Sequence, residues 1–216
     1  MACALLCLRV YKNKKLPATN YQLQTRLFIL CILKVTNAEN SSLQVMKMDR
    51  PQYTLTRLDR MSQEEFTAAL GEIWEETPAI ANRAWHNRPF EDVEALYRAM
   101  VAVVESMSET QQLDLIKAHP DLGSKAKMAQ ASVEEQSGVG LDRLSESEYE
   151  RFQSFNQAYK DKFGFPFIVA VKYHTKESIL DAFETRLQNG QEEEIQQALT
   201  EISKIARLRL EALVEK

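Results

Sequence analysis

Residues 145–164 read SESEYERFQSFNQAYKDKFG, and this stretch carries the signals of one complete helix. Ser145 and Glu148 have the spacing of a capping box, in which side chain and backbone satisfy each other's hydrogen bonds in the first turn. Aromatic residues follow at helical spacing, at Tyr149, Phe152, Phe155, Tyr159 and Phe163. Gly164 is typical of a helix C-terminus. The stretch therefore predicts a helix with one aromatic face.

Residues 165–171, FPFIVAV, come next and are the only strand-like run in the chain. A lone strand has no partner with which to form a sheet. The run is therefore predicted to be a buried extended segment or the start of a helix. Beyond it, Thr175 can cap a helix that ends near Gly190, and a last helix is predicted over about 191–213.

Similar helix starts recur on the N-terminal side of this region. They lie at Ser62–Glu65, Ser108–Gln111 and Ser132–Glu135. Between the first two, an apolar stripe with helical spacing consists of Val93, Leu96, Tyr97, Met100, Val101, Val104 and Met107. The sequence therefore predicts an all-α fold, a single-domain bundle of about eight helices.

Length and charge limit the possible functions. The chain has 216 residues, enough for one domain with an appendage, and no run reaches the roughly 18 apolar residues of a transmembrane helix. Residues 1–45 hold six Lys and Arg and one acid, so the remainder carries 21 basic and 30 acidic residues. An acidic body without basic clusters offers little to the phosphates of nucleic acid. Neither nucleic acid nor a membrane is therefore expected as a partner.

The first 45 residues differ from the rest of the chain. Cys3, Cys7 and Cys31 are the three cysteines of the sequence, so the remainder cannot use a thiol nucleophile or a thiolate metal site. The segment lacks a signal-peptide pattern and a sustained helical period. Residues 1–45 are predicted to be an extension, disordered or read from a start codon upstream of the true one, with a targeting or regulatory peptide as the alternative. Residues 46–216 are predicted to form the folded domain.

His119 stands directly before Pro120, in the stretch AHPDLG at 118–123. A residue before proline is pushed out of the α conformation, so a helix is expected to end here and the imidazole can face a cleft. Histidine titrates near neutral pH and suits acid–base catalysis. The alternatives are that His119 caps a helix or is a hydrogen-bonded core residue.

Three other features resist a purely structural explanation. Arg209 falls on the apolar stripe of the last helix, where a guanidinium is costly unless it is paired or reaches the surface. Ser132, Glu135 and Gln136 lie close to glycines that shorten their helix, where a ligand could reach them, although a capping box alone would explain the first two. The aromatic residues and proline of 163–168 could fill the core or form the wall of a small-molecule pocket.

Five motifs in a fixed order make the chain resemble a known enzyme family. They are HPDLG at 119–123, SVEEQ at 132–136, GVGL at 138–141, FGFPF at 163–167 and EISKIARLRL at 201–210. Each motif alone is weak, but the ordered set resembles the 2-oxo-4-hydroxy-4-carboxy-5-ureidoimidazoline (OHCU) decarboxylases of urate breakdown. The resemblance covers about Leu55 to Leu213. It departs from the family in a shorter stretch between the first two motifs and in the residues at 138–140.

The resemblance implies an all-helical, cofactor-free, homodimeric enzyme that converts OHCU to (S)-allantoin. It places the catalytic residues at His119 and Glu135, with no metal. The substrate-binding positions that it implies are Pro120, Ser132, Gln136, Phe167, Ile168, Val169, Ala170 and Arg209. The substrate's own ring C=N can accept the electrons that decarboxylation releases. Arg209 would orient the substrate, His119 would move the proton, and Glu135 would bind the ureido group and hold the imidazole tautomer.

Other classes of protein stay open on the sequence alone. A non-catalytic helical protein that binds purine metabolites would keep Arg209 and Gln136 but would not need His119. A metal-dependent lyase could use His119, Asp121 and Glu135, although these lack the spacing of a ligand set. A helical protein–protein module would tolerate loss of the histidine.

The C-terminal VEK is not a peroxisomal signal, so the cytoplasm is expected. The reaction implies a functional link to hydroxyisourate hydrolase and uricase.

Overall fold

The structure, a computed structural model, describes residues 53–123 and 130–215. Over these residues it contains α-helices and short 3₁₀ turns and no β-strand, with one isolated bridge between Tyr53 and Val214. The all-α prediction is confirmed, and the described residues form nine α-helices. Residues 1–45 lie outside the described residues, so the extension expected there stays a prediction.

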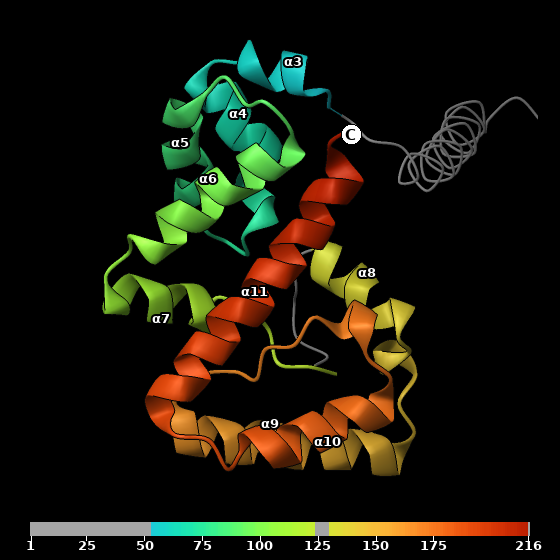
Figure 1. Ribbon diagram of the computed structural model, residues 1–216. Coiled ribbons are helices and arrows are strands. Elements are labelled where there is room, and N and C mark those ends of the chain that lie inside the picture. The colour runs from blue at the N-terminus through green and yellow to red at the C-terminus, as the bar shows by residue number, and fades with distance from the viewer. Residues whose placement is uncertain (1–52, 124–129, 216) are drawn as a thin grey trace, which may run out of the picture. The chain divides into compact units, whose positions relative to one another are not determined.

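The helices fall into two groups along the chain (Figure 1). The first group is α3 (Leu55–Asp59), α4 (Gln63–Leu70), η2 (Gly71–Ile73), α5 (Ala79–Ala84), η3 (Trp85–Asn87) and α6 (Val93–Glu105). The second is α7 (Glu109–Lys117), α8 (Gln130–Gly138), η4 (Leu141–Arg143), α9 (Glu146–Phe163), η5 (Val171–Tyr173), α10 (Lys176–Arg186) and α11 (Gln191–Leu213). The long helix α11 runs between α3–α6 at one end and α9 and α10 at the other (Figure 1).

Local capping explains where four of these helices begin. Ser62, Ser108 and Ser145 each accept a hydrogen bond from the backbone N–H three residues later, and that later side chain bonds their own N–H in return. Thr175 caps α10 in the same way. Gly164 ends α9 in the left-handed conformation, with φ 76°. These helix starts and this helix end are as the sequence predicts.

The capping box predicted at Ser132 and Glu135 is wrong. The helix α8 begins at Gln130, so Ser132 lies inside it and not at its N-cap. The Ser132 hydroxyl instead bonds side chains that other elements bring to it. Those tertiary partners account for the serine and the glutamate without any capping role.

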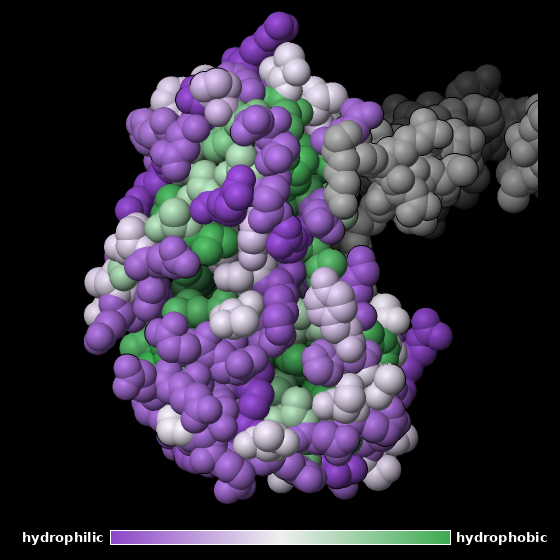
Figure 2. Space-filling view, in the orientation of Figure 1, coloured by the Kyte–Doolittle hydropathy of each residue, from purple (hydrophilic) through white to green (hydrophobic). Residues whose placement is uncertain are grey.

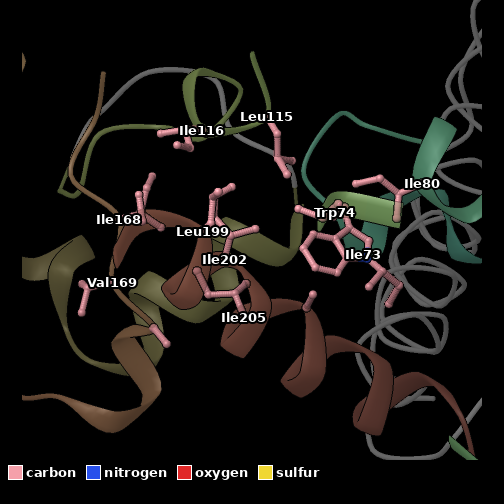
Figure 3. Close-up of a cluster of buried hydrophobic side chains, with 14 of the residues drawn as sticks. Ile73, Trp74, Ile80, Leu115, Ile116, Ile168, Val169, Leu199, Ile202 and Ile205 are labelled. Carbon is pink, nitrogen blue, oxygen red and sulfur yellow. The ribbon is translucent and has the colours of Figure 1, made fainter. Parts of the chain in front are cut away.

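The hydrophobic core lies along α11. In Figure 3, Leu199, Ile202 and Ile205 of this helix stand in the middle of a cluster of buried side chains. Around them lie Ile73, Trp74, Ile80, Leu115, Ile116, Ile168 and Val169. Burying one such side chain is worth roughly 1.5–3 kcal/mol relative to exposing it. The cluster therefore fixes η2, the end of α7 and the segment before η5 against the same helix.

Residues 165–170 form the buried extended segment that was one of the two predicted possibilities. Two hydrogen bonds to side chains fix its backbone. The Ala170 N–H donates to Oε2 of Glu201 on α11 at 2.9 Å, and the Ile168 carbonyl accepts from Nη1 of Arg186 on α10 at 2.6 Å. Buried backbone groups need such partners because water cannot reach them. The segment is therefore held by charged side chains of α10 and α11 as well as by packing.

Hydrophilic residues cover most of the face shown in Figure 2, and hydrophobic residues appear between them. Among the described residues, the large hydrophobic side chains that are exposed are Val133 (40%) and Tyr173 (62%). Within 53–123 and 130–215, no helix combines the length and the apolar character needed to span a membrane. The apolar faces of the helices are thus turned largely into the core.

Candidate active site

His119 follows the end of α7 and is 8% exposed. Its Nδ1 lies 3.0 Å from the Leu115 carbonyl oxygen. Since a carbonyl can only accept, Nδ1 carries the proton and Nε2 is left with a lone pair in the neutral ring. Burial lowers the pKa of His119 from 6.5 to about 4, against the opposing effects of the Leu115 hydrogen bond and the Glu75 charge. The imidazole is therefore a neutral base at physiological pH.

Arg209 lies on the buried side of α11, as its position on the apolar stripe predicts, with a side chain 8% exposed. Its Nε and Nη2 donate to the two carboxylate oxygens of Glu135 on α8, at 2.7 and 2.9 Å. Such a bidentate pair is among the stronger charge-assisted contacts in proteins. Burial alone would lower the pKa of Arg209, but the carboxylates of Glu135 and Glu75 outweigh it and raise that pKa.

A second acid, Glu75, completes the group. It stands in the turn after η2 and is 2% exposed. Its Oε2 accepts from Nη1 of Arg209 at 2.9 Å and from the Ser132 hydroxyl at 2.8 Å. The Ser132 oxygen in turn accepts from Nη2 of Arg209 at 3.0 Å. Side chains from three distant parts of the chain therefore form one hydrogen-bonded group around a single guanidinium.

Gln136 is also buried, and it makes a hydrogen bond to the backbone of the turn after His119. Its Oε1 accepts from the Gly123 N–H at 2.9 Å. The Leu122 carbonyl in the same turn accepts from Nδ2 of Asn156 on α9 at 2.8 Å. Gly123 has φ 65°, a left-handed conformation that glycine adopts without strain. Gln136 and Asn156 therefore fix the turn that follows His119.

The other predicted binding positions are Pro120, Phe167, Ile168, Val169 and Ala170. Pro120 is half-buried directly after His119, and the remaining four are buried in the extended segment. The Phe167 ring stacks on Phe183 at 3.8 Å, with the Arg186 guanidinium 4.4 Å from its centre. The described contacts of this segment thus join it to α9, α10 and α11.

The structure joins Arg209, Glu135 and Ser132 by direct hydrogen bonds. His119 lies near enough for the charges of Glu75 and Arg209 to act on its pKa. The structure differs from the sequence-based hypothesis on one role. In that hypothesis Glu135 fixes the tautomer of the His119 imidazole. In the structure the Leu115 carbonyl contacts the imidazole Nδ1, and Glu135 pairs with Arg209. The tautomer is set within the last turn of α7.

Glu75 is the site residue that sequence reasoning missed. The helix α4 ends at Leu70. A helical period marks apolar positions, so it does not identify an acidic residue in a turn five residues later. The one available signal was the position of an acid directly after Trp74, which is 1% exposed. A neighbour of a fully buried residue in a turn can itself be drawn into the core.

Two further observations concern other kinds of site. Within the described residues, no three His, Cys, Asp or Glu side chains gather in a group that could hold a metal ion. A hollow of about 460 Å³ between α3, α6 and α11 is lined by Leu55, Glu91, Asp92, Val93, Glu94, Tyr97, Arg207, Leu210 and Glu211. None of the predicted site residues lines it, so the candidate site is the group around Arg209 and His119.

Comparisons with known proteins connect this site to a family. Residues 59–211 match the family model described as OHCU decarboxylase. A 2-oxo-4-hydroxy-4-carboxy-5-ureidoimidazoline decarboxylase of Halalkalicoccus jeotgali is 44% identical over 160 residues, which are 74% of this chain and 91% of that protein. A uric acid degradation bifunctional protein of Bacillus subtilis is 44% identical over 162 residues, 75% of this chain but 33% of that longer protein.

The fold agrees with these matches. A crystal structure of (S)-allantoin synthase superposes with a TM-score of 0.61 and 33% sequence identity, covering 74% of this chain and 54% of that one. The residues that the family model matches include every residue of the candidate site, from Glu75 to Arg209. The chain belongs to the OHCU decarboxylase family.

Proposed function

We propose that this protein is a cofactor-independent decarboxylase that converts OHCU to (S)-allantoin in urate degradation. One observation carries the proposal: a buried histidine whose Nδ1 is held by the Leu115 carbonyl lies where the charges of Glu75 and Arg209 act on its pKa, beside an arginine that is paired bidentately with a carboxylate. An anionic substrate needs a cation to hold it, and a proton-transfer reaction needs a base that is unprotonated at neutral pH. The two groups supply these functions.

The substrate chemistry explains the role of each group. When the bond between C4 and the carboxylate breaks, CO₂ leaves and its electron pair enters the ring, where the C=N at C5 accepts it. The C4 hydroxyl then loses its proton and becomes a carbonyl, C5 gains a proton, and the ring nitrogen that received the electron pair takes one further proton from water. Nε2 of His119 carries the lone pair that can take the proton of the C4 hydroxyl and then return it to C5. Delivery from one side would give a single enantiomer.

Glu135 and Arg209 would bind the substrate. The Glu135 side chain is 27% exposed, so it borders the open side of the site and can accept hydrogen bonds from the ureido N–H groups. Arg209 can hold the substrate carboxylate with the fork that now holds Glu135. The buried segment of Phe167, Ile168, Val169 and Ala170 would form a wall of the pocket, with Pro120, Ser132 and Gln136 on other sides.

The test is circular dichroism of allantoin formation, with OHCU generated in the cuvette from urate by uricase and hydroxyisourate hydrolase. The wild-type protein should give a rapid, optically active signal. His119→Asn should lose nearly all turnover, about 100-fold or more, because the asparagine amide cannot take up and return the proton. His86→Asn is the matched control, since His86 is exposed in η3.

Two results would contradict the proposal. A slow racemic product from the wild-type protein would show that it does not catalyse the reaction. Full activity of His119→Asn in a folded protein would remove the acid–base assignment. A protein that bound the substrate tightly without turnover would instead be the metabolite-binding protein that the sequence leaves open.

We also propose a homodimer in the cytoplasm that acts together with the two preceding enzymes. The dimer follows from the family resemblance, and sedimentation velocity would test it directly. The link to neighbouring reactions is supported by the Bacillus relative, whose name describes a bifunctional protein of uric acid degradation and which is about three times as long as the matched region.

A further inference from the structure

Both donor edges of the Arg209 guanidinium are occupied. Along one edge, Nε and Nη2 hold Glu135 at 2.7 and 2.9 Å. Along the other, Nη1 donates to Glu75 at 2.9 Å and Nη2 to Ser132 at 3.0 Å. A carboxylate substrate can therefore reach this guanidinium only by replacing one of the two sets of partners.

The two carboxylates differ in how firmly they are held. Glu75 is 2% exposed, and the Ser132 hydroxyl donates a second hydrogen bond to the oxygen that faces Arg209. Its own carbonyl accepts from the Thr77 hydroxyl at 2.8 Å, which fixes the turn that carries it. A charge buried to this degree cannot leave its partners without a large desolvation penalty. The Glu135 side chain, at 27% exposure, can turn toward water at little cost.

We propose that Glu75 is a positioning residue that, together with Ser132, clamps the inner edge of Arg209, so that the outer edge can exchange Glu135 for the carboxylate of the substrate. This inference rests on the proposed decarboxylase function. The substrate carboxylate matches the fork geometry that Glu135 now satisfies. Glu135, once released, is free to accept hydrogen bonds from the rest of the same substrate.

The clamp makes a specific kinetic prediction because the substrate loses its charge as it reacts. The carboxylate becomes neutral CO₂, so its contact with Arg209 is stronger in the bound substrate than in the transition state. A loosened Arg209 should therefore raise KM more than it lowers kcat. A variant that merely misfolds in part would lower kcat and leave KM unchanged.

The experiment compares Glu75→Ala, Glu75→Gln and Glu76→Ala with the wild-type protein in the coupled allantoin assay. Glu75→Ala should raise KM by about tenfold or more with kcat changed less than about threefold. Glu75→Gln keeps one acceptor beside Arg209, so its KM should rise less, by about threefold. Glu76 is exposed beside it, and its replacement should leave both constants unchanged.

The outcomes separate the two proposals. Wild-type protein without activity would overturn the decarboxylase function itself. Active wild-type protein with unchanged KM in Glu75→Ala, or with a loss in kcat alone, would overturn the clamp. If Glu75→Ala does not fold, Glu75→Gln decides the question, because a KM equal to the wild-type value in that variant contradicts the proposal.

Discussion

Arg209 has both a structural and a functional role, because it joins α11 to neighbouring elements and supplies the charge of the candidate site. Its neighbours on the α11 stripe are apolar, so its charge is tolerated only because Glu135, Glu75 and Ser132 surround it. Nε and Nη2 donate to Glu135, Nη1 donates to Glu75, and Nη2 also donates to Ser132. The three nitrogens lie in the single plane of the guanidinium. A compact ammonium group could replace the charge of the guanidinium but not this planar set of donors.

Arg209→Lys should therefore lose activity while keeping the fold. One ammonium nitrogen cannot span both carboxylates, so at least two charge-assisted hydrogen bonds are lost, and kcat/KM should fall about 100-fold or more. The coupled allantoin assay measures this loss, and far-ultraviolet circular dichroism checks the helices. Arg207→Lys is the control, because Arg207 pairs with Glu94 at a half-exposed position. Equal activity of the two variants would contradict the role of the guanidinium fork.

At the scale of the element, the end of α9 places the extended segment. Gly164 takes φ 76° at the C-cap and its N–H donates to the Lys160 carbonyl. The chain then turns directly into Phe165 and the buried run before η5. A side chain at Gly164 would meet no atom within 4 Å, so any cost of substitution there comes from the backbone conformation alone.

Gly164→Ala should lower the free energy of unfolding by about 1 kcal/mol, the cost of a left-handed conformation for a residue with a Cβ. Gly138→Ala is the control, because the same substitution is made at a glycine without a left-handed φ. Gly138 ends α8 with ordinary φ and open space around it, so alanine should be neutral or stabilising, by up to about 1 kcal/mol. Urea unfolding of both variants measures the difference. The same sign of change in both would show that φ at position 164 does not limit stability.

The helices were predictable where their signals are local. The cap residues Ser62, Ser108, Ser145 and Thr175 act within one turn of backbone, so sequence spacing alone locates them. Ser132 has the same spacing, but its partners are far away in sequence and no local pattern contains them.

The candidate site follows the same division. Arg209 could be predicted because a charge on an apolar stripe demands a partner, but the stripe does not say which carboxylate supplies it. Glu75 lies 134 residues from Arg209 along the chain, in a turn without a period. Likewise, the contact of Gln136 with the Gly123 backbone needs a loop and a helix to meet. Contacts between segments that lie far apart in the sequence are visible only in the folded structure, so the roles of Glu75 and Gln136 could not be predicted.

At the scale of the whole molecule, two groups tie stability to pH in separate ranges. Burial lowers the pKa of His119 from 6.5 to about 4. Glu148, at the start of α9, has its pKa lowered from 4.5 to about 2 by hydrogen bonds from Ser145 and Lys176. In both cases the unfolded chain binds protons more readily than the folded one, so acid favours unfolding. The histidine acts at the higher pH and the glutamate at the lower.

The sign and size for His119 follow from its two pKa values. Between pH 6.5 and about 4 the unfolded chain is protonated at this residue while the folded chain is neutral, so its contribution is complete above pH 6.5 and is lost as the pH falls toward 4. The full difference corresponds to about 3 kcal/mol. Urea unfolding at pH 7, 6, 5 and 4 should show this decline in the wild-type protein and in His86→Asn. His119→Asn should lack the decline above pH 5, since asparagine does not titrate, and an identical slope in all three proteins would mean that the buried imidazole does not govern acid stability.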